Sequence, residues 1–168
     1  MNEFKVSEVF YSAQGEGRFI GVPSVFFRTF GCNFKCPGFG LPAGEKTTEP
    51  DDIGKVVHLY STFNDLPLAN TGCDSYASWH PAFKHLSPSY SVEQSIDTML
   101  DLTPNNKWVQ DNGNDVHLVI TGGEPLLGWQ MLYPSLLSNA RMQDLANLTF
   151  ETNGTQTLHN DFHEYLFL

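Results

Sequence analysis

Three cysteines are the side chains with the clearest capacity for chemistry in this sequence. Cys32 and Cys36 have three residues between them, whereas 36 residues separate Cys36 from Cys73. Three thiolates can hold a four-iron cluster and leave the fourth iron open to a ligand. Three thiolates together with His80 or His85 could instead hold a zinc ion, since zinc sites tolerate short gaps between paired ligands. The spacing of the cysteines leaves both kinds of metal site open.

The composition indicates a single globular domain over residues 1–168. Of these residues, 40% are apolar and 13% aromatic, which is enough for a sizeable core. There are 19 acidic and 9 basic residues, and the formal net charge is -10. A broad basic surface for direct contact with nucleic acid is therefore not expected. These totals favour a small molecule or another protein as the partner.

The sequence carries no signal for export or for a membrane. No stretch approaches the roughly 20 apolar residues of a membrane span, and residues 1–5 lack the layout of a signal peptide. Three cysteines also fit a reducing compartment, with a metal or catalytic use, better than a disulfide framework. We therefore expect a cytoplasmic protein without membrane contact.

Three apolar segments are predicted to be strands, and each ends in a loop with polar or metal-binding side chains. Residues 24–30 are rich in β-branched and aromatic side chains and end just before the first cysteine. Residues 116–120 form a near-continuous apolar run before the loop 121–125. The short segment 148–150 precedes the loop 151–155 in the same way.

Two helical patterns separate these strands. Ser91 and Gln94 have the spacing of a capping box, ahead of apolar residues that recur on one face. Residues 129–145 repeat leucine and alanine at helical spacing. A further strand is predicted at 4–11, followed by a glycine-rich turn at 14–17. Alternating strands and helices predict parallel strands with a site at their C-terminal edge.

The segment from about 41 to 88 interrupts this alternation. It contains five prolines, many polar residues and no sustained periodicity. Most of it lies between the second and third cysteines. We interpret it as an irregular insertion in an α/β domain.

Four short motifs occur in the order found in one enzyme family. They are YSAQGEG at 11–17, GCNFKC at 31–36, TGGEP at 121–125 and ETNGT at 151–155. From about residue 5 to 157 the chain resembles the 7-carboxy-7-deazaguanine synthases of the radical S-adenosylmethionine superfamily. The resemblance implies an α/β fold, a partial radical S-adenosylmethionine β/α barrel with mostly parallel strands. It also implies a 4Fe-4S cluster and S-adenosylmethionine as cofactors.

The third cysteine departs from the family's pattern, in which two residues separate it from the second. Phe39 stands at the equivalent position here, whereas Cys73, Asp74 and Ser75 resemble the family's continuation after its third cysteine. We therefore interpret all three cysteines as ligands of one cluster whose motif is split by the insertion. Lengthening the segment from 2 to 36 residues adds about 2.6 kcal/mol of closure entropy. A structural metal site can contribute roughly 10 kcal/mol, so the split is affordable.

The resemblance also implies contacts to the cofactors. The residues that it assigns to S-adenosylmethionine are Gly122, Gly123, Glu124, Glu151, Thr152 and Asn153. The first three would offer backbone carbonyls and a carboxylate to the α-ammonium group. Ser75 would be a magnesium ligand, because its hydroxyl is a hard oxygen donor.

The substrate contacts implied in the same way are Ala13, Gln14, Gly15, Arg28 and Thr121. Arg28 suits a planar carboxylate because a guanidinium can donate two parallel hydrogen bonds. The implied substrate is a small pterin, 6-carboxy-5,6,7,8-tetrahydropterin. No catalytic residue beyond the cluster ligands is assigned.

The reaction implied by the resemblance is that of a radical lyase. The pterin would be converted to 7-carboxy-7-deazaguanine with loss of ammonia, a step of queuosine-type 7-deazaguanine biosynthesis. The protein would bind and shield the substrate while the cofactors carry the bond breaking. An electron-donor protein and the family's usual homodimer are also expected.

The family's pattern continues through further strands after the motif at 151–155, whereas this chain has 168 residues. We therefore expect a shortened C-terminus without the last part of the barrel. An apolar face of Leu158, Phe162 and Tyr165 would then have little to cover it. The activity of this chain on its own depends on whether those strands are dispensable.

Three other interpretations are left open by the sequence. The chain could be a zinc-stabilised binding module, which would hold one zinc ion and no iron. It could be another radical S-adenosylmethionine enzyme, with a different substrate. It could also be a remnant that holds no metal, in which case replacing Cys73 would change little.

Overall fold

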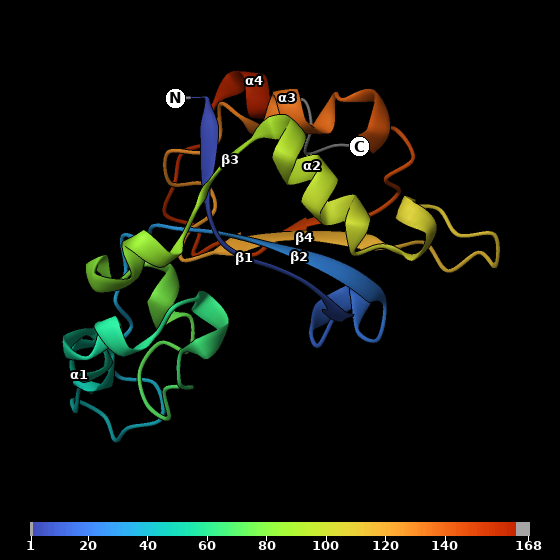
Figure 1. The fold of residues 1–168 in the computed structure, drawn as a ribbon. Coiled ribbons are helices and arrows are strands. Elements are labelled where there is room, and N and C mark those ends of the chain that lie inside the picture. Colours follow the sequence, from blue (N-terminus) through green and yellow to red (C-terminus); the bar gives the residue numbers. More distant parts are fainter. Residues whose placement is uncertain (1, 164–168) are drawn as a thin grey trace.

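The computed structural model describes residues 2–163, which form a five-stranded sheet with helices on one face (Figure 1). The strand order is β3-β1-β2-β4-β5. The strands are β1 (Glu3–Ala13), β2 (Pro23–Thr29), β3 (Ser89–Ser91), β4 (His117–Gly122) and β5 (Leu148–Phe150). The predicted α/β class and the three predicted apolar strands are confirmed.

The sheet is mixed and, within residues 2–163, open. β1 pairs antiparallel with both β2 and β3, whereas β4 pairs parallel with β2 and β5. The expectation of mostly parallel strands is therefore not borne out. The physical reason lies in the connection between β1 and β2, which is too short for a parallel crossover of a dozen or more residues.

The two predicted helices differ in how well they match the structure. Helix α2 (Val92–Asp101) begins at the predicted capping box, in which Gln94 N donates to Ser91 Oγ at 3.1 Å. Helix α3 (Tyr133–Leu137) is much shorter than the predicted span of 129–145. The helix ends there because the Asn139 side chain caps a separate turn by accepting from Arg141 N at 3.1 Å.

The remaining helical elements are short. They are α1 (Glu49–Lys55), α4 (Asn160–His163) and 3-10 turns at Gly17–Phe19, Val57–Leu59, Phe63–Asp65, Tyr76–Ser78, Pro81–Leu86, Pro104–Asn106 and Ala140–Met142. Among the helices of residues 2–163, none combines the length and apolar character needed to cross a membrane.

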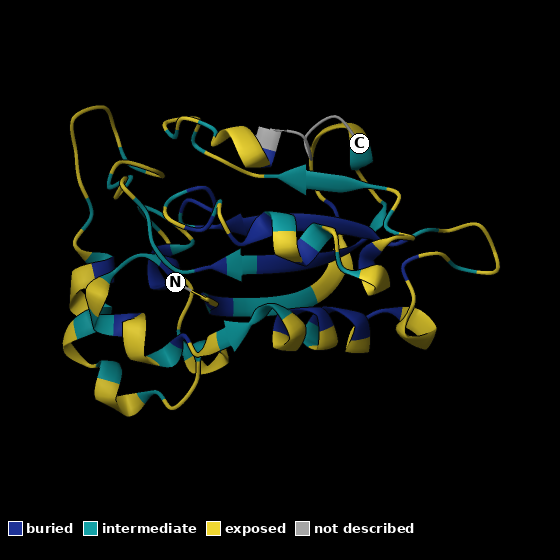
Figure 2. Ribbon diagram, turned by 90° about the horizontal axis from the view of Figure 1, so that it is seen from above, coloured by how far each residue is buried: buried dark blue, intermediate teal, exposed yellow. Residues whose placement is uncertain are grey.

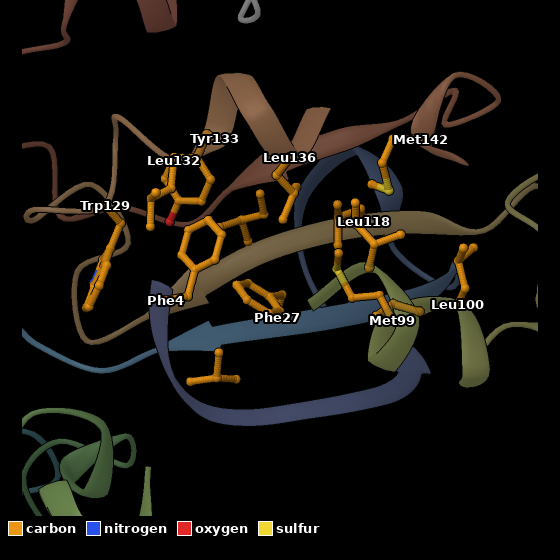
Figure 3. Packing of buried hydrophobic residues seen from close by; sticks show 14 of the residues in the cluster. Phe4, Phe27, Met99, Leu100, Leu118, Trp129, Leu132, Tyr133, Leu136 and Met142 are labelled. Atoms are coloured by element: carbon orange, nitrogen blue, oxygen red, sulfur yellow. The ribbon is translucent and has the colours of Figure 1, made fainter. Parts of the chain in front are cut away.

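The main core lies between the sheet and the helices α2 and α3 (Figure 3). β2 and β4 alternate, so that Phe27 and Leu118 point to the helices and pack with Met99 and Leu136. All four side chains are fully buried. Figure 2 shows that the central strands are largely buried, whereas exposed residues dominate the insertion.

The opposite face of the sheet carries polar side chains among apolar ones. The residues that point there from β2 and β4 are Ser24, Phe26, Arg28, His117, Val119 and Thr121, which alternate with the core residues. Phe26 stacks on Phe10 of β1 with ring centroids 4.7 Å apart. This face lies on the side of the sheet opposite to α2 and α3 (Figure 1).

The segment 41–88 packs around a small core of its own. Tyr76, Ala77 and Phe83 are buried there, and Ile53 of α1 packs against them. The Tyr76 hydroxyl donates to Pro67 O at 2.6 Å, which ties the two halves of the segment together. The irregular sequence thus forms a defined structure through aromatic packing and short turns.

Phe162 is covered, contrary to the expectation of an apolar face with little to cover it. Its side chain is 1% exposed, and its ring centroid lies 5.1 Å from that of Phe150 and 5.6 Å from that of Tyr133. Leu158 packs against the same core. Helix α4 therefore closes the core beside β5, and Tyr165 lies outside the described residues.

Candidate functional site

The loops that follow β2, β4 and β5 meet at one edge of the sheet. Parallel pairing aligns Thr29 with Gly122, and Glu151 N donates to Ile120 O at 3.0 Å. Glu124 N donates to Gly31 O at 2.7 Å and so joins the loop after β4 to the loop after β2. The convergence predicted for the C-terminal ends of parallel strands is present for these three strands.

Glu124 is a buried carboxylate at the centre of these loops. It is 0% exposed, and its oxygens accept from Leu126 N at 3.0 Å and from Asn153 N at 2.7 Å. The Thr152 hydroxyl lies 2.7 Å from Oε1 and 2.9 Å from Oε2 of the same carboxylate. Glu124 therefore holds the loops after β4 and β5 together, and Thr152 and Asn153 contact it directly.

Gly122 and Gly123 allow the loop after β4 to lie against the loop that carries Cys32. A Cβ atom on Gly123 would lie 2.5 Å from Gly31 O and 2.7 Å from Cys32 Cβ. A Cβ atom on Gly122 would lie 2.7 Å from Thr29 Oγ1. Both positions require glycine because the two backbones approach too closely for any side chain.

The three cysteines gather at this same edge. All three are free and partly buried. Burial raises the pKa of the Cys32 and Cys36 thiols, and the charge of Cys73 raises both further. Gly72 N donates to Phe39 O at 2.7 Å, which brings Cys73 back towards Cys36 although 36 residues separate the two cysteines. The insertion folds back, so that the chain at Gly72 returns to its start.

The zinc alternative would need His80 or His85 beside the three thiols. Within residues 2–163, no group of three or more His, Cys, Asp or Glu side chains is close enough to hold one metal ion. His80 is engaged inside the insertion, where Nε2 lies 3.0 Å from Asp51 Oδ1 and Nδ1 accepts from Ala82 N at 3.2 Å. The described hydrogen bonds of His80 thus lie inside the insertion.

Arg28 connects three segments at the edge of the site. Its Nε donates to Glu8 Oε2 at 3.2 Å, and its Nη1 donates to Ser75 Oγ at 2.9 Å and to Gly122 O at 3.5 Å. The Ser75 hydroxyl also lies 3.1 Å from Asp74 Oδ1. Ser75, predicted to bind magnesium, and Arg28, predicted to bind a substrate carboxylate, are thus bonded to each other.

Gln14 links the turn after β1 to the end of β5. It is 7% exposed, and its Nε2 donates to Glu151 Oε1 at 3.1 Å. Its Oε1 accepts from Gly15 N at 2.7 Å. Ala13 and Gly15 are exposed, whereas Thr121 is 4% exposed. The structure therefore brings together Gln14 of the first motif, at 11–17, and Glu151 of the last, at 151–155.

Two contributions to this region were not predicted from the sequence. Asn33 accepts from Asn153 Nδ2 at 2.9 Å and donates to Thr155 Oγ1 at 2.8 Å, which binds the Cys32 loop to the loop after β5. Asn153 Nδ2 also lies 3.9 Å from Cys32 Sγ. The position of Asn33 inside the motif GCNFKC was the available signal, but a single asparagine in a loop does not reveal its partner.

His117 was not assigned a role; it is the first residue of β4 and belongs to the polar face of the sheet. It is 0% exposed, with Nδ1 3.2 Å from Ser24 Oγ and Nε2 2.8 Å from Thr149 Oγ1. Burial lowers the pKa of its imidazole. The alternation of His117, Val119 and Thr121 along one strand was the signal that could have placed it on this face.

Taken together, the fold and the site define an α/β protein in which strand-end loops gather three cysteines beside a double glycine. Known proteins resemble it over nearly its whole length. A 7-carboxy-7-deazaguanine synthase of Halobacterium salinarum is 32% identical over 158 residues, which cover 93% of this chain and 40% of that protein. The protein of the same name from Rhodopirellula baltica is 32% identical over 150 residues, covering 89% and 38%.

A third protein of that name, from Aquifex aeolicus, is 41% identical over 97 residues, covering 52% of this chain and 42% of that protein. Among solved structures, the crystal structure of QueE from Escherichia coli has a TM-score of 0.48 and 22% identity. That comparison covers 94% of this chain and 56% of the other. No protein-family model matches the chain.

These matches identify the chain as a relative of the 7-carboxy-7-deazaguanine synthases, which confirms the resemblance seen in the motifs. The chain spans about two fifths of the length of the first two relatives.

Proposed function

We propose that the chain is a radical S-adenosylmethionine lyase that converts 6-carboxy-5,6,7,8-tetrahydropterin to 7-carboxy-7-deazaguanine with loss of ammonia. The observation that carries the proposal is the return of the chain before Cys73 to the residues around Cys36, where Gly72 N donates to Phe39 O at 2.7 Å. The similarity to proteins named 7-carboxy-7-deazaguanine synthase supports the choice of reaction.

The three cysteines would hold the 4Fe-4S cluster, and the neighbouring glycines would face S-adenosylmethionine. When bound, the cluster and S-adenosylmethionine supply a carbon radical that abstracts hydrogen from the substrate. Gly123 lies against Cys32, and Gly122 precedes it, so their backbone carbonyls would be offered to the α-ammonium group. The Glu124 carboxylate already accepts hydrogen bonds within the chain, so it also positions Thr152 and Asn153. Glu151 would add a cofactor contact from the end of β5.

The substrate would bind on the polar face, next to the strand ends. Arg28 would receive its carboxylate, since its side chain is 17% exposed and lies near the C-terminal end of β2. Gln14 and the turn at Ala13 and Gly15 would border the ring, together with Thr121. The hydrogen bond between Gln14 and Glu151 supports a shared boundary for cofactor and substrate.

Magnesium would bind at Ser75 with Asp74 supplying a carboxylate beside it. In the observed arrangement the Ser75 hydroxyl accepts from Arg28. A divalent cation at this oxygen would repel the guanidinium, so Arg28 must leave Ser75 when magnesium binds. Transfer of Arg28 from Ser75 to the substrate carboxylate would meet that requirement.

The wider architecture follows from the same proposal. The open sheet would be part of a radical S-adenosylmethionine barrel, within a single domain that includes the insertion at 41–88. An electron-donor protein would supply the reducing electron. A cytoplasmic homodimer completes the expectation from the family.

The test is anaerobic reconstitution of the chain with iron and sulfide. We expect iron and sulfide in the ratio of a 4Fe-4S cluster, 5′-deoxyadenosine from S-adenosylmethionine, and 7-carboxy-7-deazaguanine from the pterin. The Cys73→Ala variant should lose the iron. Phe39→Ala should keep it, because Phe39 stands where the family has its third cysteine but offers no thiol to the cluster. One zinc ion per chain in place of iron would reject the proposal in favour of a zinc-stabilised module.

A further inference from the structure

Two backbone hydrogen bonds close the base of the insertion beside the cysteines. Thr47 N donates to Pro37 O at 2.8 Å, and Gly72 N donates to Phe39 O at 2.7 Å. Pro37 follows Cys36 directly, and Gly72 precedes Cys73. A Cβ atom on Gly72 would lie 3.8 Å from Cys36 O, which shows how closely the two ends approach.

A cluster of four residues holds this base from the outside. We call it the insertion clasp; it consists of Thr47, Glu49, Asn70 and Thr71. Thr71 Oγ1 lies 2.7 Å from both Thr47 Oγ1 and Glu49 Oε1, and Asn70 N donates to Glu49 Oε2 at 2.7 Å. Glu49 N donates to Thr47 Oγ1 at 3.0 Å. The Glu49 carboxylate thereby joins the outgoing segment of the insertion to the returning segment.

Glu49 is itself held in place by the small core of the insertion. It is the first residue of α1, and Ile53 of the same helix packs against Tyr76 and Phe83. Pro50 is buried at the helix start. Hydrogen bonds from Thr71 and Asn70 lower the pKa of the Glu49 carboxyl. The carboxylate therefore keeps the ionised form, which accepts the stronger hydrogen bonds.

We infer that Glu49 and Thr71 are positioning residues for the third cluster ligand. They hold the returning chain at residues 70–72 against the outgoing chain, so that Cys73 stays close to Cys36 before any cluster is assembled. The inference rests on the proposed cluster site for its purpose, but the closeness of the two thiols can be measured without a cluster. Neither residue lies in a motif that the sequence similarity singled out.

The test uses the full chain with Cys32→Ser, in which Cys36 and Cys73 are the two remaining thiols. Dibromobimane becomes fluorescent when it alkylates two thiols, so its fluorescence reports bridging of this pair in the metal-free chain. We expect rapid bridging in this background. Glu49→Ala and Thr71→Val should each slow it about fivefold, as expected for loss of a charge-assisted hydrogen bond.

Two matched variants serve as controls. Glu45→Ala removes an exposed glutamate of the same insertion, and Thr71→Ser keeps the hydroxyl of the clasp. Both should bridge as fast as the background. Equal bridging in all these proteins, including no bridging in any of them, would overturn the inference.

Iron uptake by the corresponding chains with all three cysteines separates this inference from the proposed function. We expect Glu49→Ala to take up less iron than Glu45→Ala under the same reconstitution. If the clasp variants slow bridging while no chain takes up iron, the clasp stands and the cluster proposal fails. If every chain takes up iron and bridging is unchanged, the clasp is wrong and the cluster proposal stands.

Discussion

Cys32 and Cys73 reach the same edge of the sheet by different means. Cys32 follows β2, and its loop is fixed by backbone contacts to the double glycine after β4. Cys73 lies within a long insertion, and its approach is set by two backbone hydrogen bonds, the side-chain hydrogen bonds of the clasp and a small aromatic core. The comparison teaches that one site can combine a rigid half built on sheet register with a half whose geometry depends on a few side chains.

The largest expected effect comes from breaking the small core of the insertion. Phe83 is 0% exposed and contacts Tyr76 edge-on, with ring centroids 5.2 Å apart. Phe83→Ala should cost about 4 kcal/mol through lost burial and a cavity. Limited proteolysis should then cut within 41–88 while the sheet resists. Leu68→Ala, at an 89% exposed residue, is the control. Cleavage of the sheet as well would show that the sheet depends on the small core of the insertion, contrary to this expectation.

The next effect tests the rigid half. Gly123→Ala would place a methyl group 2.5 Å from Gly31 O, and the backbone must shift to accept it. We expect a loss of about 3 kcal/mol from overpacking, measured by chemical denaturation. Gly38→Ala meets only an ordinary contact of 3.6 Å with Glu45 O and should change stability little. Similar stability of the two variants would show that the loops are less tightly packed than described.

A smaller effect is expected at the carboxylate that joins the strand-end loops. Glu124→Gln preserves the shape but replaces one accepting oxygen with a donor that faces Leu126 N or Asn153 N. The buried mismatch should cost about 2 kcal/mol. Glu16→Gln, at an exposed position, should cost almost nothing. Amide hydrogen exchange in the Glu124→Gln variant should become faster in residues 151–155 and stay unchanged in residues 70–73.

The smallest effect concerns pH. Burial lowers the pKa of His117, so the unfolded chain binds a proton more readily than the folded chain. Stability should therefore be complete above the ordinary pKa of about 6.5 and fall as the pH drops below it, by at most about 1.4 kcal/mol per pH unit. His117→Gln should flatten this slope in urea titrations between pH 7 and 5. His58→Gln, at an exposed residue, should leave it unchanged.

Much of the sheet could be predicted because its strands carry strong local patterns. The apolar runs that became β2 and β4 identify buried strands, and the capping box of Ser91 and Gln94 identifies the start of α2. The three polar residues of β3 gave no such pattern, since this strand depends on pairing with β1. The antiparallel placement of β1 was legible in the short turn after it but was not inferred.

The candidate site divides in the same way. Motifs at the ends of strands predicted which loops would converge, because sheet register determines where those ends lie. The bonds from Arg28 to Ser75 and from Thr71 to Glu49 join residues 47 and 22 positions apart. Such pairs depend on how the insertion folds back, and no local pattern in the sequence records that path.

Because of the hydrogen bonds at the base of the insertion, the distance between Cys36 and Cys73 does not depend on the length of the chain between them. Once Thr47 N meets Pro37 O and Gly72 N meets Phe39 O, the span from Cys36 to Cys73 is set by the few residues inside these bonds. Chain that lies beyond them adds mass and surface without changing that span. The insertion thus behaves as a side branch of the polypeptide, and its outer turns are free to diverge in length while the thiols keep their places.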